Sequence, residues 1–463
     1  MQETKQNKMG VMPVQKLLIT MSLPMVISML VQAMYNLIDS VFVSRIDQDA
    51  LTAVNMAFPM QSLMIAFQTG LGVGMNAVIS RLLGEKRPRD AGYAATHGLI
   101  LTLVNYIIFL IAGLTAARTF FSVQSKSAAV IQYGVDYLSI VCVFSFGLFF
   151  QICFERFLQA TGKTVYSMIM QGTGALINII LDPVFIFGVK ALGIPAMGVK
   201  GAAIATVCGQ ITGCLLGVFL HFRFNKELKA VFRGFRPQIS TIKRIYAVGI
   251  PSIMMSALVS VMTYCMNIIL KDYEETAATA YGVYIKLQSF AAMLVFGLNN
   301  GIVPIIAYNY GARKGGRIVK AVRLGVIYAT AVMITGVLLF QLLPEFFLSF
   351  FNPDDALVAS GVPALRTLSL SLLFAGASIV MCSSFQALGF GVRSLLVFLV
   401  RFLVPTLPLA WLFGKLWGTA AIWFMLPISE LCGLLLAVFF MIKTYKTTIK
   451  PMIGQGELSE GVD

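Results

Sequence analysis

Long apolar runs dominate the chain, and short polar stretches separate them. A helix needs about 20 apolar residues to cross the hydrocarbon core of a bilayer, and the chain has about twelve such runs. The pattern therefore predicts an all-α membrane protein with twelve transmembrane helices. We expect the spans at 14–44, 51–82, 92–117, 128–154, 162–188, 198–222, 241–270, 277–310, 317–343, 362–388, 394–414 and 418–443.

The pattern repeats once, with a constant shift along the chain. Pro24 and Pro251 open matching apolar segments (251 − 24 = 227), and the same shift carries Ser167 onto Ser394. Since six spans return the chain to its starting side, both copies enter the bilayer in the same orientation. We therefore expect two six-helix bundles related by a pseudo-twofold axis along the membrane normal. The expected parts are an N-terminal bundle at 1–222, a cytoplasmic linker at 223–240, a C-terminal bundle at 241–450 and a cytoplasmic tail at 451–463.

Composition supports a protein that is dissolved in lipid. Hydrophobic residues make up 58% of the chain and charged residues 12%, and the mean hydropathy is +0.84. The net charge of +15 would suggest nucleic acid as the partner of a soluble protein. Here the basic residues gather in the loops after spans two, six, eight and twelve, and the positive-inside rule places those loops in the cytoplasm. We expect a multi-pass protein of the cytoplasmic (inner) membrane with both termini inside and no nucleic-acid partner.

The acid pair Asp39 and Asp182 occurs in only one copy of the repeat. Asp39 lies in span one and Asp182 in span five, and the repeat places apolar residues at both equivalent positions. A charged group at the bilayer centre costs about 2.5–3.5 kcal/mol, so each one is a functional candidate. Asn178 shares a helical face with Asp182, and Thr206 lies in span six. Asp39, Asp182 and Thr206 each lie roughly 9 Å from the predicted outer end of their helix, at 1.5 Å per residue.

Two carboxylates that meet in a low dielectric cannot both stay ionised without a counter-charge. Either one takes up a proton or both coordinate a cation. The amide oxygen of Asn178 and the hydroxyl of Thr206 are hard ligands that suit an alkali cation such as Na⁺. We therefore predict a cation site formed by Asp39, Asn178, Asp182 and Thr206. The alternative is that the acids only satisfy neighbouring donors within the packed bundle.

Other polar positions suggest a substrate path and a hinge. Pro24 removes a backbone hydrogen bond inside span one, which predicts either a static kink or a moving hinge. In the second copy, Arg401 and Glu430 lie at similar depth in adjacent spans, and we predict a structural ion pair, with a transport role as the alternative. Glu155 and Arg156, at the end of span four, are expected to form a solvated or latch-forming pair. The residues expected along the path or hinge are Pro24, Gln32, Tyr35, Asn36, Met64, Gln68, Asn299 and Asn300.

Several segments together resemble the multidrug and toxic compound extrusion (MATE) transporters, and the resemblance covers nearly the whole chain. The segment from Gly297 to Ala312 is similar to the MepA-like subgroup in particular. The other segments that carry the resemblance are 34–43 in span one, 157–162 after span four, 178–183 in span five and 201–206 in span six.

The resemblance implies export of organic cations and amphipathic drugs by alternating access, in exchange for H⁺ or Na⁺. It also implies that Asp39, Asn178, Asp182 and Thr206 form the cation site, because these four match the family's residues. NorM-type members carry acids in helices seven and ten, but spans 241–270 and 362–388 have none. Coupling is therefore expected in the first bundle, in a monomer without a cofactor.

Three other kinds of protein are compatible with a helical membrane bundle. A lipid-linked saccharide flippase would need a wide cationic cavity, with Arg366 or Arg401 facing it. A membrane enzyme would need a catalytic set, but the spans hold no HExxH motif, paired histidines or nucleophile–base pair. A passive channel would conduct without turnover, and an acid site in only one copy favours a carrier. We therefore expect a transporter and not an enzyme.

Overall fold

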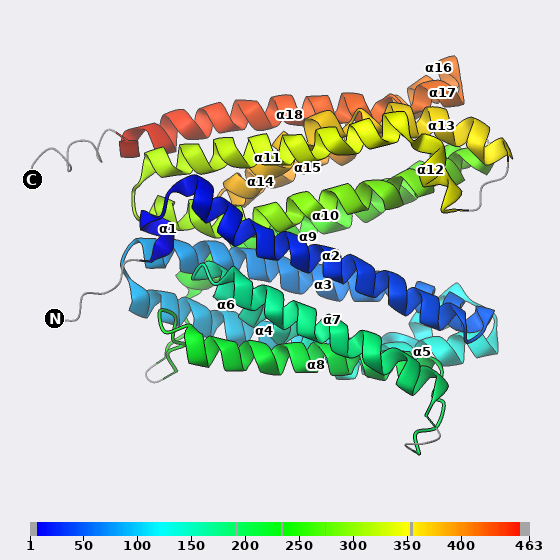
Figure 1. The fold of residues 1–463 in the computed structure, drawn as a ribbon, viewed down its shortest axis with the longest axis horizontal. Helices are drawn as coiled ribbons and strands as arrows, with labels where there is room; N and C mark the ends of the chain where they lie inside the picture. The colour runs from blue at the N-terminus through cyan, green and yellow to red at the C-terminus, as the bar shows by residue number, and fades with distance from the viewer. Residues whose placement is uncertain (1–6, 190–192, 233–234, 274, 352–354, 454–463) are drawn as a thin grey trace, which may run out of the picture. The chain divides into compact units, whose positions relative to one another are not determined.

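Helices make up nearly all of the described chain in the computed structural model (Figure 1). The structure describes residues 7–189, 193–232, 235–273, 275–351 and 355–453, so the predicted tail at 451–463 lies outside them from residue 454 on. The helices are α1 (Lys8–Val11), α2 (Val14–Ser44), α3 (Gln48–Gly84), α4 (Pro88–Gln124), α5 (Ala128–Val143), α6 (Phe146–Ala160), α7 (Thr164–Phe187), α8 (Val199–Phe224), α9 (Ile239–Lys271), α10 (Glu275–Gly311), α11 (Gly315–Leu342), α12 (Pro344–Ser349), α13 (Asp355–Ser369), α14 (Leu372–Ala387), α15 (Gly391–Phe402), α16 (Thr406–Trp417), α17 (Thr419–Ile422), α18 (Met425–Thr444) and the π-helix η2 (Tyr445–Ile449).

The prediction of twelve membrane helices is confirmed. Among the described residues, ten helices are long and apolar enough to cross a membrane, and the number is twelve when each of two bent pairs is one span. The bent pairs are α5 with α6, at 44°, and α13 with α14, at 45°. Their breaks begin after Val143 and Ser369 (369 − 143 = 226). The repeat therefore extends to the breaks, within one position of the shift seen in the sequence.

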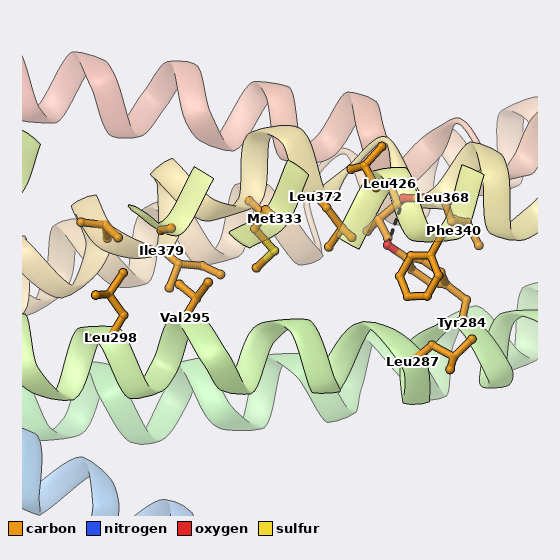
Figure 2. Close-up of a cluster of buried hydrophobic side chains, with 14 of the residues drawn as sticks. Tyr284, Leu287, Val295, Leu298, Met333, Phe340, Leu368, Leu372, Ile379 and Leu426 are labelled. Carbon is orange, nitrogen blue, oxygen red and sulfur yellow. Dashed lines mark hydrogen bonds between the residues drawn. The ribbon is translucent and has the colours of Figure 1, made fainter. Parts of the chain in front are cut away.

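Tyrosine hydroxyls donate to backbone carbonyls at the two breaks. Tyr284 donates its hydroxyl to the Leu368 carbonyl over 2.9 Å, as Figure 2 shows. At the other break, Tyr106 donates to the Val143 carbonyl over 3.1 Å. A carbonyl without a partner costs several kcal/mol in a membrane interior. The bond from Tyr106 thus supplies a partner for the Val143 carbonyl, whereas the Leu368 carbonyl also accepts from the Ser371 N–H over 3.1 Å.

The chain divides into two compact units. The N-terminal unit consists of residues 27–83 and 87–245, and the C-terminal unit consists of residues 1–26, 84–86 and 246–463. The segment that precedes Ile27 thus belongs with the second half of the chain. The division into bundles at 1–222 and 241–450 stays a prediction.

Specific contacts hold the segment before Ile27 to the C-terminal unit. Ser22 on α2 donates to the Leu298 carbonyl of α10 over 3.0 Å. A Cβ atom at Gly301 would lie 2.3 Å from the Ser22 hydroxyl, so only glycine permits this approach of α2 to α10. Ahead of α2, Arg317 donates to the carbonyls of Met9 and Met12 over 3.0 and 2.7 Å. The helix α2 therefore begins in the C-terminal unit and carries Asp39 in the N-terminal unit.

The segment between α8 and α9, which contains the predicted linker, packs against α4. Thr96 accepts a hydrogen bond from the Val231 backbone N–H over 2.9 Å. His97 Nε2 accepts from the Gln238 backbone N–H over 2.8 Å, and its Nδ1 donates to the Tyr93 carbonyl over 2.7 Å. The ring thus uses both nitrogens, as a neutral imidazole can. The described part of the linker is clamped to the N-terminal unit.

An apolar core fills the C-terminal unit (Figure 2). Val295 on α10, Met333 on α11, Leu372 on α14 and Leu426 on α18 are all buried and belong to one cluster. This core includes α18, the helix that also carries Glu430.

Candidate functional site

Glycines bring α7 and α8 into backbone contact, and Figure 1 shows the two helices side by side. A Cβ atom at Gly209 would lie 2.6 Å from the Gly174 carbonyl oxygen and 3.0 Å from Asn178 Cβ. A Cβ atom at Gly201 would lie 2.3 Å from the Phe185 carbonyl oxygen. Since no side chain separates the two backbones at these glycines, Asn178 on α7 reaches α8 directly.

Asn178 joins the two helices and holds one carboxylate. Its neighbours favour the amide orientation in which the nitrogen donates to Asp182 over 3.1 Å and the oxygen accepts from the Thr206 N–H over 3.1 Å. Asn178, Asp182 and Thr206 are 2%, 0% and 4% exposed. The three residues therefore form one hydrogen-bonded group inside the N-terminal unit.

Asp39 brings the second carboxylate to this group from α2. Its charge interacts with that of Asp182, so the two carboxylates lie within electrostatic range. The Oδ1 atom of Asp39 is buried and has no hydrogen-bond partner. Among the described residues, neither acid forms an ion pair with a basic side chain. We call Asp39, Asn178, Asp182 and Thr206 the acid nest.

Two tyrosines border the acid nest. The hydroxyls of Tyr35 on α2 and Tyr137 on α5 both interact with the Thr206 side chain and with the charges of both acids. Gln61 on α3 donates to the Tyr137 hydroxyl over 3.0 Å. Tyr35 was expected on the substrate path, and the structure places it at the nest. Sequence reasoning missed Tyr137, because an uncharged tyrosine in an apolar span gives no signal of its own.

The structure places other expected path residues elsewhere. Gln68 is fully buried, and its amide pairs with Thr102 over 3.0 Å and with Asn105 over 3.4 Å. Met64 is fully buried in the same unit, with its sulfur 3.9 Å from that of Cys142. Both side chains are thus part of the core between α3 and its neighbours.

The remaining path residues lie on α2 and α10. Asn36 is exposed and Gln32 is half-buried on α2, and Pro24 is buried within that helix without ending it. On α10, Asn299 is 4% exposed, and both ends of its amide are buried without a hydrogen-bond partner. Asn300 next to it is half-buried.

Glu155 and Arg156 are buried, so the prediction of a solvated pair is wrong. Two glutamines satisfy the Glu155 carboxylate: Gln159 donates to it over 2.6 Å and Gln171 over 3.0 Å. Arg156 in turn donates to Gln159 over 2.9 Å. Glu155 and Gln159 are four positions apart on α6, a spacing that places them on one helical face. That spacing was the available signal of a buried network.

The acid nest has the ligands that a small cation needs. Two carboxylates and a hydroxyl supply hard oxygen atoms, which suit Na⁺, whereas the Asn178 amide oxygen already accepts from the Thr206 N–H and its nitrogen faces Asp182. The unpartnered oxygen of Asp39 suits either a proton or a cation. Among the described residues, no group of three or more His, Cys, Asp and Glu side chains gathers as it would around a transition metal. The nest therefore fits a proton or an alkali cation.

Duplicated six-helix bundles with a buried ion site define a class of membrane carriers. The MatE family model matches this chain twice, at residues 24–184 and 251–412, and the starts of the two matches show the shift of the repeat (251 − 24 = 227). The chain belongs to the MatE family. The family is one of membrane transporters.

Relatives match over nearly the full length of the chain. The multidrug export protein MepA of Staphylococcus haemolyticus is 28% identical over 429 residues, which are 91% of this chain and 92% of that protein. MepA of Staphylococcus aureus MRSA252 is 26% identical over 456 residues, 97% of both chains. A crystal structure of MATE in the bent conformation has a TM-score of 0.90 at 24% identity and covers 97% of this chain and 99% of that one. The structural likeness confirms the fold.

Proposed function

We propose that this chain is a multidrug efflux antiporter, which exports organic cations and amphipathic drugs in exchange for H⁺ or Na⁺ by alternating access. The observation that carries the proposal is the buried hydrogen-bonded group of Asn178, Asp182 and Thr206 in the N-terminal unit, whose acid forms no ion pair with a basic side chain among the described residues. The names of the MepA relatives support export of several drugs.

The charge balance at the acid nest supports coupling to a cation. Two carboxylates within range of each other destabilise one another until a proton or Na⁺ arrives. Each charge that moves inward contributes about 2.3 kcal/mol per 100 mV of membrane potential. Binding of the cation thus removes the repulsion, and the membrane potential favours its inward passage.

The course of α2 supports a route by which ion binding changes conformation. Asp39 lies on the part of α2 that belongs to the N-terminal unit, whereas Pro24 and the positions before it belong to the C-terminal unit. Neutralisation of Asp39 changes the forces on the outer part of α2, and the missing hydrogen bond at Pro24 provides a place to bend. In this proposal, bending of α2 biases the units toward release of drug outside.

We further propose a monomer in the cytoplasmic (inner) membrane with both termini in the cytoplasm, on the basis of the basic loops. The flippase alternative relies on Arg366 or Arg401 to line a cationic cavity, and it now depends on Arg366, which is exposed. Arg401 is 2% exposed and forms an ion pair with Glu430.

Transport by purified protein in liposomes tests the proposal. A fluorescent organic cation is loaded, and sodium and pH gradients are imposed separately at a fixed membrane potential. We expect one of the two gradients to drive accumulation against the concentration gradient of the dye, and its dissipation to stop accumulation. Dye movement that follows only its own gradient, whichever ion gradient is imposed, would contradict antiport.

A further inference from the structure

The C-terminal unit contains a buried ion pair between α15 and α18. Arg401 donates from Nε to Glu430 Oε2 over 2.8 Å and from Nη2 to Glu430 Oε1 over 2.9 Å. The side chains of Arg401 and Glu430 are 2% and 0% exposed. This is the two-point geometry in which guanidinium and carboxylate bind most strongly.

The surroundings of Arg401 are shaped to hold its side chain. A Cβ atom at Gly433 would lie 2.1 Å from Arg401 Cγ, so glycine provides the room through which the arginine passes. The rings of Phe398 and Phe402 both lie 5.0 Å from the guanidinium carbon, within the range of cation–π attraction. The third guanidinium nitrogen, Nη1, is buried without a hydrogen-bond partner. The pocket therefore holds a cation among apolar walls.

The repeat relates this ion pair to the helices of the acid nest. The shift that carries Ser167 on α7 onto Ser394 on α15 (394 − 167 = 227) places Arg401 opposite Gly174 (401 − 227 = 174). The next helices, α8 and α18, follow a slightly smaller offset. The glycine N-caps before α8 and α17 both have positive φ angles and show it (418 − 198 = 220). Glu430 is then equivalent to Gln210 (430 − 220 = 210).

In the N-terminal unit the same layer holds no charge. Gly174 lies one helical turn from Asn178, and Gln210 lies one turn from Thr206, so this layer borders the acid nest. The side-chain oxygen of Gln210 is buried without a hydrogen-bond partner. Where the C-terminal unit has an arginine held by a carboxylate, the N-terminal unit has a glycine and a free amide oxygen.

Stability alone gives no reason for such a pair. Among the described residues of the C-terminal unit, Glu430 is the one buried acid. Apolar residues of similar volume are often as stable as a buried ion pair or more so. What the pair does supply is a cation that cannot leave its carboxylate.

We propose that Arg401 is a tethered cation: its guanidinium permanently occupies Glu430 and so prevents the C-terminal unit from exchanging a coupling ion. The acid nest of the N-terminal unit then alone sets the number of ions exchanged per drug. Without the guanidinium, Glu430 becomes an acceptor for a small monovalent cation, either Na⁺ or a proton. The part of this inference that concerns stoichiometry rests on the proposed function, whereas the occupation of Glu430 does not.

Coupling stoichiometry in liposomes tests the inference. The substitution Arg401→Met removes the guanidinium at similar volume, and the matched control Arg401→Met/Glu430→Gln removes the carboxylate as well. The reversal potential of drug flux gives the number of ions per drug. We expect that number to rise by one in Arg401→Met and to return to the wild-type value in the double variant. The same number in Arg401→Met as in the wild type, or an increase in both variants, would overturn the inference.

A binding measurement covers the case in which Arg401→Met does not transport. The melting temperature of each purified variant is followed in Na⁺, in guanidinium at low concentration and in N-methylglucamine at equal ionic strength, and also as the pH is lowered. We expect Na⁺, guanidinium or acid to stabilise Arg401→Met but not the double variant. Identical responses of the two variants would overturn the inference. This measurement needs no transport, so it also separates the inference from a failure of the proposed antiport.

Discussion

Replacement of Asp39 by asparagine tests the coupling mechanism most sharply. The change keeps the shape of the side chain and removes its charge beside Asp182. An organic cation that leaves while one ion enters moves no net charge, so the concentration gradient of the ion sets the drug gradient. A tenfold ion gradient is worth about 1.4 kcal/mol and supports about tenfold drug accumulation. We therefore expect Asp39→Asn to insert normally and to lose drug accumulation by about this factor.

The assay is accumulation of a fluorescent organic cation in proteoliposomes under a gradient of the coupling ion of about tenfold, with the membrane potential held at zero. Asp182→Asn should give the same loss, because the two carboxylates serve one ion. Asp136→Asn is the matched control, since Asp136 belongs to the same unit and pairs with Lys200 over 3.4 Å. Wild-type accumulation in both Asp39→Asn and Asp182→Asn would refute the reasoning.

Three further substitutions test the packing and the clamps that the structure shows. Gly209→Ala places a Cβ atom 2.6 Å from a carbonyl oxygen, so we expect stability to fall by about 1–3 kcal/mol and ion-driven transport to be lost. Gly172→Ala is the control, because a Cβ atom there meets no atom within 4 Å. In this control, neither the melting temperature nor efflux should change. Glu430→Gln leaves the buried Arg401 unpaired, and a loss of about 3–5 kcal/mol should appear as a lower melting temperature. His97→Ala removes the acceptor for the Gln238 N–H, so limited trypsin digestion should cut the linker faster than in the wild type.

The number of spans and the duplication could be predicted from the sequence, because lipid imposes a minimum length on every apolar run. The four-position step from Asn178 to Asp182 also placed two nest residues on the same helical face. The close approach of α7 and α8 was harder to predict from the sequence. It depends on which glycines face each other across the two helices, Gly174 and Gly209, and a single sequence does not show that register.

Contacts between distant segments could not be predicted from the sequence. His97 accepts a hydrogen bond from the backbone N–H of Gln238, which lies far along the chain. A backbone donor of this kind cannot be recognised from the pattern of side chains. Glu155 was expected to form a solvated or latch-forming pair with Arg156 near a helix end, but two glutamines satisfy its carboxylate inside the unit. The segment before Ile27 joins the C-terminal unit through Ser22, whose partner on α10 is more than half a chain away.

The central claim is that two acids from different helices bind one cation together. Equilibrium binding of radioactive sodium to the purified protein, with the protons taken up or released recorded alongside, measures this directly. We predict one Na⁺ or one proton per chain in the wild type, lost to the same degree in Asp39→Asn and in Asp182→Asn. Undiminished binding in either single variant would contradict a shared site.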